Sequence, residues 1–324
     1  MSRKIALLGP QAPTPDVGAM LKELGIKGPV ALVRAGYQER ESDDEATVAD
    51  LGVPTVNLTL HARGADVFKN APEFSTAYSV RQQRLRYMQG FYHTRLESTE
   101  EAAKRISLRY VEPELLAQEE KVSVDQYRYM DHDHIERCQA VRAKFDAAWP
   151  ASKVELIAKH RQEIKDLMAP CEALVIAGGH VASLLNRLQI FDVVTANGEK
   201  PIVAWSAGAM VLMHRIVLFH DYPPYGSDIA QVLDAGLGLV PNYVVLPDAR
   251  RRINLSAKVG IQRFARRMAP ATCVAMDNGS RMIFDGTELI EANATLLNTK
   301  GEAERDWRGD ASRFSTPYMH GVHV

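Results

Sequence analysis

The chain has 324 residues, of which 46% are hydrophobic and 24% charged, and its formal net charge is −1. This length is enough for one large α/β domain or two smaller ones with a substantial core. The balanced charge gives no reason to expect nucleic acid or an anionic membrane as a partner, and no apolar run approaches the roughly 20 residues of a membrane span. Three widely spaced cysteines argue against a disulfide framework and favour a reducing, cytoplasmic location.

The first 72 residues alternate between strand-like and helix-like segments. The apolar runs "KIALLGP", "GPVALVRAG" and "VPTVNLTL" are short and bounded by Gly and Pro. Between them lie "TPDVGAMLKELGI", which is apolar at helical spacing, and "DDEATVADLG". Strands that are apolar on both faces are typical of a parallel sheet covered by helices on both sides. We therefore interpret residues 1–72 as the first part of an α/β domain.

Residues 73–170 have a different composition. They are rich in Glu, Lys, Arg, Gln and Tyr, contain a single glycine and show no strand-like run. Two Ser-x-x-Glu sequences, at Ser98 and Ser152, fit the capping box that opens a helix, and Pro113 and Pro150 divide the segment. The pattern predicts an all-helical insertion of three or four helices. It could be a surface cover without chemistry, a lid over an active site or a dimer interface.

The alternation resumes at residue 171. The runs "ALVIAGG" and "PIVAWS" predict strands on either side of the helical "HVASLLNRLQIFDVV". They are followed by "RIVLFHD", "YVVL", the helical "INLSAKVGIQRFARRMA" and "TCVAMDNGSRMIFDGTELIEA". Two turn sequences in the last run predict two or three antiparallel strands. We assign residues 171–292 to the second part of the α/β domain and residues 293–324 to a C-terminal tail.

A candidate nucleophile lies in "IVAWSAGAMV", residues 202–211, where a buried strand ends at Ser206 and a helix begins. At such a turn the serine Oγ projects from the sheet edge, and the next backbone N–H, that of Ala207, points to where an oxyanion would form. Ala204 stands where the G-x-S-x-G pattern has its first glycine, so the strict motif is not met. A serine that merely caps a core helix would look similar.

A glycine pair, Gly178 and Gly179, ends the preceding strand in "IAGGHVASLL". Glycines at a strand-to-helix junction allow close backbone approach and free N–H groups. The pair is a candidate second oxyanion donor, and the alternative is an ordinary turn between strand and helix.

Four segments taken in order resemble one family. "ALVIAGGHVASLL", "PIVAWSAGAMVL", "GLGLVP" and "CVAMDNGSRMIFDG" are similar to motifs of the peptidase E (aspartyl dipeptidase) and cyanophycinase family. The resemblance covers about residues 170–292, extends loosely to the N-terminal strands and leaves out the helical insertion. It implies a serine hydrolase of small peptides or amides. It also implies the class I glutamine-amidotransferase-like fold, a flavodoxin-like, three-layer α/β arrangement around a mostly parallel sheet.

The resemblance assigns roles position by position. Ser206 falls on the nucleophile, and Gly179 and Ala207 fall on the oxyanion donors. Asp221 falls near the acidic member of the catalytic triad. His180 stands where the family usually has Asn.

The triad histidine has no counterpart at its usual place, which Asp248 occupies. A carboxylate with a pKa near 4 is a weak base towards a serine hydroxyl and cannot act as imidazole does at neutral pH. Three histidines could replace it: His220, beside Asp221, is our first choice, His180 the second, and His214 remains open.

Three arginines follow Asp248 in the sequence, beginning with Arg250. They could pair with Asp248 or bind a substrate carboxylate through two parallel hydrogen bonds. They could equally form the solvated start of a helix.

A metal site is not expected. In "DHDHIERC", residues 131–138, His134 and Cys138 share a helix face, but His132 does not join them, so we predict a polar helix face. The sequence contains no phosphate-binding loop and no dinucleotide fingerprint, and we expect no cofactor.

Two classes of function remain open. The first is a serine hydrolase of small peptides or amides with an altered base, acting on a small substrate and not on nucleic acid or membrane. The alternative is a non-catalytic relative that binds a ligand or, through the helical insertion, a protein partner. A homodimer is compatible with either.

Overall fold

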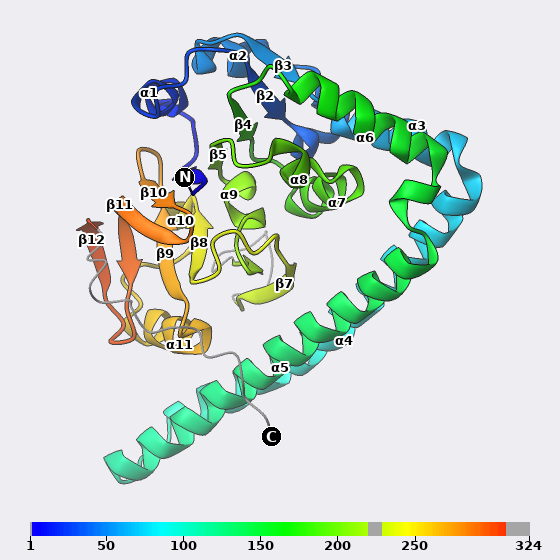
Figure 1. Ribbon diagram of the computed structural model, residues 1–324. Helices are drawn as coiled ribbons and strands as arrows, with labels where there is room; N and C mark the ends of the chain where they lie inside the picture. Colours follow the sequence, from blue (N-terminus) through cyan, green and yellow to red (C-terminus); the bar gives the residue numbers. More distant parts are fainter. Residues whose placement is uncertain (1, 220–228, 309–324) are drawn as a thin grey trace.

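A ten-stranded sheet forms the centre of the computed structural model, which describes residues 2–219 and 229–308 (Figure 1). Its strands are β1 (Lys4–Leu8), β2 (Val30–Val33), β3 (Thr55–Asn57), β4 (Ala173–Ile176), β5 (Ile202–Trp205), β8 (Tyr243–Pro247), β9 (Thr272–Met276), β10 (Arg281–Asp285), β11 (Glu288–Leu297) and β12 (Ala303–Trp307). The order across the sheet is β3-β2-β4-β5-β1-β10-β11-β9-β8, and β12 pairs with β11.

The sheet has a parallel half and a mixed half. Strands β3, β2, β4, β5 and β1 run parallel to one another, whereas β10 pairs antiparallel with both β1 and β11. Beyond them β9 pairs antiparallel with β11 and parallel with β8. The predicted α/β fold with a mostly parallel sheet is confirmed. Because all strands of the parallel half point the same way, their C-terminal ends meet at one edge, where such sheets place ligands.

Helices cover both faces of the parallel half. On one face lie α1 (Val17–Glu23) and α2 (Glu45–Leu51), and on the other α3 (Leu60–Asn70), α6 (Glu155–Met168), α7 (Val181–Phe191) and α9 (Ala207–Val211). Successive strand residues alternate between the two cores: Leu7 packs with the α7 side, and Leu8 packs with the α1 side. This two-sided burial is why the strands are apolar throughout.

The segment from residue 73 to 170 is helical in the structure and adds no strand to the sheet. Its main part is a hairpin of two long helices, α4 (Pro72–Ser107) and α5 (Pro113–Ala148), followed by η2 (Ala151–Lys153) and α6. In Figure 1 the hairpin extends past the α/β body as a long arm, with the connecting loop at its far end. The hairpin contacts α3, β7 (Gln231–Ala235) and α11 (Lys258–Met268).

The two predicted capping boxes are wrong. Ser98 lies inside α4, where its hydroxyl donates to the Thr94 carbonyl at 3.2 Å, so it caps nothing. Helix α6 begins after Val154, and no side chain caps its N-terminus. Both prolines mark boundaries as expected. Pro113 opens α5, where proline at the first helical position loses no intrahelical hydrogen bond, and Pro150 lies between the end of α5 and η2.

The remaining elements complete the body of the molecule. They are η1 (Ala35–Arg40), α8 (Val193–Asn197), β6 (Arg215–Leu218) and α10 (Ala249–Arg252). Strands β6 and β7 form a separate two-stranded sheet. The expected tail after residue 292 instead continues β11 to Leu297 and adds β12, which pairs with it. No helix within the described ranges has both the length and the apolar character needed to cross a membrane.

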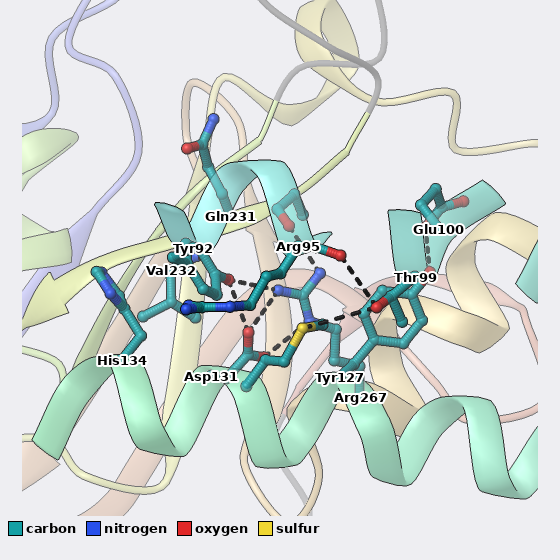
Figure 2. A network of polar contacts seen from close by, with 12 residues as sticks. Tyr92, Arg95, Thr99, Glu100, Tyr127, Asp131, His134, Gln231, Val232 and Arg267 are labelled. Atoms are coloured by element: carbon teal, nitrogen blue, oxygen red, sulfur yellow. Dashed lines mark hydrogen bonds and ion pairs between the residues drawn. The ribbon is translucent and has the colours of Figure 1, made fainter. Parts of the chain in front are cut away.

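A buried ion pair joins the hairpin to the body (Figure 2). Arg267 of α11 donates to both carboxylate oxygens of Asp131 on α5, at 2.8 and 2.7 Å. Asp131 is 1% and Arg267 4% exposed. Tyr92 of α4 donates to Asp131 at 2.7 Å and accepts from the backbone N–H of Val232 in β7 at 3.1 Å. The network therefore connects both hairpin helices to β7 and α11.

The polar helix face predicted at residues 131–138 is partly buried against the body of the protein. Asp131, His134 and Cys138 are all buried. The His134 ring stacks on Tyr92 at 4.4 Å between centroids, and its Nε2 lies 3.3 Å from the Leu233 carbonyl. Asp131 and His134 thus face the body of the protein and contact its polar groups there, whereas His132 and Glu136 are exposed.

Candidate active site

Ser206 lies in the tight turn between β5 and α9, at the C-terminal end of the strand as expected. Its backbone has φ 53° and ψ −122°, a conformation that non-glycine residues rarely adopt. The residue is half-buried, and among the described residues no hydrogen bond to its Oγ is found. Such a strained conformation persists only where the surrounding structure holds it. Here it places the Ser206 hydroxyl at the edge of the sheet.

Two glycines allow the backbone to pack closely around the turn. A Cβ on Gly208 would lie 2.2 Å from the carbonyl oxygen of Ile176, so α9 can approach the end of β4 only without a side chain there. A Cβ on Gly236 would lie 2.2 Å from the carbonyl oxygen of Met213. Residues 236–240, the "GLGLV" motif, therefore pack directly against the end of α9. This close approach explains the glycines that carry the family resemblance.

The glycine pair after β4 faces the serine. A Cβ on Gly178 would lie 3.0 Å from the Ser206 Cβ, 3.6 Å from its Oγ and 3.7 Å from the backbone nitrogen of Ala207. Gly179 has φ 102°, which favours glycine, and the following His180 N–H donates to the Gly36 carbonyl at 2.6 Å. The structure therefore brings Gly178, Ser206 and Ala207 together.

If Ser206 is the nucleophile, Gly178→Ala is expected to reduce hydrolysis by about 100-fold, a typical loss when an oxyanion site is impaired. The new methyl group would occupy the space in front of Oγ and the Ala207 N–H. Turnover of a dipeptide substrate measures the effect. Gly90→Ala is the matched control, because nothing lies within 4 Å of its Cβ position in α4, and this variant should keep full activity. Equal activity of the two variants would contradict the placement of the oxyanion site.

His180 caps helix α7 through its side chain. Its Nδ1 accepts from the Ser183 backbone N–H at 3.2 Å and lies 3.0 Å from the Ser183 hydroxyl. That hydroxyl accepts a hydrogen bond from Gln38 Nε2 at 2.9 Å. Since Nδ1 is an acceptor here, the proton of the neutral ring resides on Nε2. In this arrangement the His180 ring offers a hydrogen-bond donor, its Nε2–H, and not a base.

Gln38 is a residue that sequence reasoning missed. It lies in η1 just after β2, at the same sheet edge, with φ 57° and ψ −124°. Its distance of 145 positions from Ser183 leaves no local pattern that would connect the two. The only signal was its place directly after a parallel strand, a position shared by many residues without a role.

Asp248 directly follows β8, a strand that packs against α9. Its backbone is left-handed, with φ 57°, and its carboxylate lies 3.7 Å from the Arg251 Nε and 4.0 Å from the Arg252 Nε. Arg250 instead pairs with Asp277, with its Nε at 3.2 Å and its backbone N–H at 3.0 Å from the carboxylate. The three arginines therefore divide between two carboxylates.

The structure describes only one of the remaining predicted site residues, His214. His220 and Asp221 lie outside the described residues. His214 is half-buried between α9 and β6, and burial lowers the pKa of its ring, with a smaller contribution from Arg215. Within residues 2–219 and 229–308, no three His, Cys, Asp or Glu side chains come together as metal ligands.

The comparison with protein families identifies the class. The model of peptidase family S51 matches residues 128–292, just over half of the chain, and the chain belongs to this family. The predicted relationship to peptidase E is thereby confirmed, and the protein is of the peptidase type. The matched range contains Ser206, the glycine pair and Asp248.

Two solved structures resemble this one in overall arrangement. A peptidase from an acI-B1 Actinobacterium has a TM-score of 0.47 and 12% sequence identity, with 92% of each chain covered. A putative peptidase E protein from Listeria monocytogenes EGD-e has a TM-score of 0.43 and 11% identity, with 92% of this chain and 100% of that chain covered. No curated protein matches the sequence. The family assignment rests on the family model.

Proposed function

We propose that this peptidase-family protein hydrolyses small peptides or amides with Ser206 as its nucleophile. The observation that supports this most strongly is the backbone of Ser206, whose φ of 53° holds the hydroxyl opposite Gly178. A serine that only capped a helix would have no need of this conformation and would hydrogen-bond the first turn of α9. No such side-chain cap is present.

The reaction follows from this arrangement. The Oγ of Ser206 attacks the substrate carbonyl carbon, and its proton passes to a base. The backbone N–H of Ala207, with the glycine turn after β4, stabilises the oxyanion that forms. The base then protonates the leaving amine as the C–N bond breaks, and a water molecule hydrolyses the resulting acyl-enzyme.

The base we propose is His220, which lies outside the described residues, with Asp221 as its carboxylate partner. His180 suits this task less well because its Nδ1 caps α7 and its Nε2 carries the proton. It is better placed to donate a hydrogen bond to a substrate oxygen. Asp248 is a weak base, as a carboxylate is at neutral pH, and its side chain already pairs with Arg251 and Arg252.

Labelling of Ser206 by a fluorophosphonate probe tests the proposal, followed by mass mapping of the adduct and assays on Asp-containing dipeptides. The native protein should form an adduct at Ser206, and His220→Ala should lower labelling about 100-fold or more. Asp248→His should label at Ser206 to the same extent as the native protein. Labelling that survives the loss of both His220 and His180 would contradict the assignment of the base.

A second candidate function is a non-catalytic relative that binds a ligand at this edge of the sheet. The observation that favours it is Asp248, which stands at the family's histidine position and pairs with arginines. In that case the native protein would label poorly and Asp248→His would raise labelling. The same experiment thus separates the two candidates.

A further inference from the structure

A cavity of about 500 Å³ lies at the base of the helical hairpin, away from Ser206. Its walls come from α4, α5, the segment around η2, α6, the C-terminal half of α7 and the start of α8, together with Leu237; Ser206 is not among the lining residues. His180 begins α7, and the cavity starts near Leu188, about 12 Å further along the helix at 1.5 Å per residue. The cavity is within the size range of small-molecule sites, and it is separate from the proposed peptidase site.

Arg81 of α4 lines this cavity as a buried cation whose hydrogen bonding is incomplete. The side chain is 8% exposed, and its guanidinium lies 4.2 Å from the Tyr78 ring centroid and 4.4 Å from that of Phe145. Its Nε has no hydrogen-bond partner within the described part of the chain. Apart from the Tyr78 side chain, its polar contacts are long: 3.5 Å to the Asn186 Oδ1 and 4.0 Å to the carboxylate of Asp146, a side chain that is 71% exposed.

The other two arginines that line the cavity have closer hydrogen-bond partners than Arg81. Arg142 forms an ion pair with Asp234 and donates to the Gln189 Oε1 at 2.9 Å. Arg161 donates from its Nε to the Ile190 carbonyl at 2.9 Å. The carboxylate of Asp234 is therefore already used by Arg142. Arg81 is left with a buried positive charge, and such a charge is costly without a close acceptor.

Part of the cavity wall is aromatic. Phe74, Phe145 and Trp149 line the cavity and pack edge to face, with centroids 5.6 Å apart for Phe74 and Phe145 and 6.3 Å for Phe74 and Trp149. These rings give apolar surface next to the guanidinium. A site with one fixed cation and an aromatic wall suits a ligand that has an anionic end and a flat apolar body.

We propose that this cavity binds a small organic anion, whose carboxylate or phosphate accepts hydrogen bonds from Arg81 and whose apolar part lies against Trp149. A guanidinium presents parallel N–H donors that match either oxyanion. The contacts with the Tyr78 and Phe145 rings restrict the position of the Arg81 guanidinium before the ligand arrives. Less conformational entropy is therefore lost on binding.

Calorimetric titration of the full-length protein with phenyl phosphate, phenylacetate and inorganic phosphate tests this site. We expect one of the two aromatic anions to bind with a Kd of about 1 mM or below, and more tightly than inorganic phosphate. The stronger of the two identifies the anionic group as phosphate or carboxylate. Arg81→Gln should weaken binding about tenfold or more, because a charge-assisted hydrogen bond is lost. Arg84→Gln, an exposed site on the same helix with the same change in charge, should leave binding unchanged.

A second pair of variants keeps the test decisive if Arg81→Gln fails to fold. Ser152 lies at the cavity mouth and is exposed, so Ser152→Glu should fold normally and repel an anion. Ser152→Gln has nearly the same size without the charge and should bind as the native protein does. Absence of binding for both aromatic anions would overturn the proposal. Binding that persists unchanged in Ser152→Glu would do so as well, because the anion would then be held elsewhere.

Discussion

Ser206→Gly should abolish peptidase activity and yet give a more stable protein than Ser206→Ala. Each variant loses the Oγ that we propose as the nucleophile, and the expected loss in turnover is about 10,000-fold or more. The difference between them arises in the backbone, because φ 53° and ψ −122° strain any residue with a Cβ by about 1–3 kcal/mol. Glycine removes this strain, and its greater freedom in the unfolded chain offsets only about 0.5–1 kcal/mol.

Urea unfolding of the two variants measures this difference in free energy. Ser152 offers a matched control because it is exposed and does not have a positive φ. There the order should reverse, with Ser152→Gly less stable than Ser152→Ala. A Ser206→Gly variant that is clearly less stable than Ser206→Ala would mean that the turn is not strained. Retained activity in both Ser206 variants would mean that the nucleophile is another residue.

Arg267→Met is expected to lower the free energy of unfolding by about 3–5 kcal/mol, a large part of the 5–15 kcal/mol that typically stabilises a protein. The substitution leaves the Asp131 carboxylate buried without its cation, and Tyr92 alone cannot compensate the charge. The hairpin also loses a connection to α11. Chemical denaturation, followed by far-ultraviolet circular dichroism, measures the loss.

Two further variants show whether the buried charge causes the effect. The double variant Asp131→Leu with Arg267→Met should recover much of the lost stability, because no uncompensated charge remains. Arg137→Met removes an exposed arginine of α5 that lies 3.4 Å from Asp133, and it should change stability by about 0.5 kcal/mol or less. If Arg267→Met costs no more than Arg137→Met, the Asp131 pair does not fix the hairpin.

The parts of the fold that were predicted correctly depend on local patterns. The strands of the parallel half were visible because residues such as Leu7 and Leu8 are apolar in succession, as burial on both faces requires. The position of Ser206 at a strand end followed from the small residues after it. The family membership followed from the order of several such segments. The roles of Ser206, His220 and Asp248 stay predictions, since they depend on chemistry that a fold alone does not test.

The capping boxes failed because a Ser-x-x-Glu spacing occurs by chance inside a long helix, as at Ser98. Strands β7 (QVLDA) and β12 (AERDW) were missed because polar residues interrupt their short sequences, and each owes its pairing to a neighbouring strand. An element of this kind forms only once its partner strand is in place.

The amino-acid sequence alone was sufficient to predict the α/β class, the helical character of residues 73–170 and the turn at Ser206. Each of these depends on backbone geometry over a few neighbouring positions. Folding in three dimensions alone decided that Asp131 meets Arg267 and that Gln38 reaches Ser183. These partners lie 136 and 145 positions apart, and no periodic pattern connects them. Their contacts arise because packing of the sheet and helices brings distant polar groups together, and Asp131 and Arg267 meet in a dry interior, where each must find a partner.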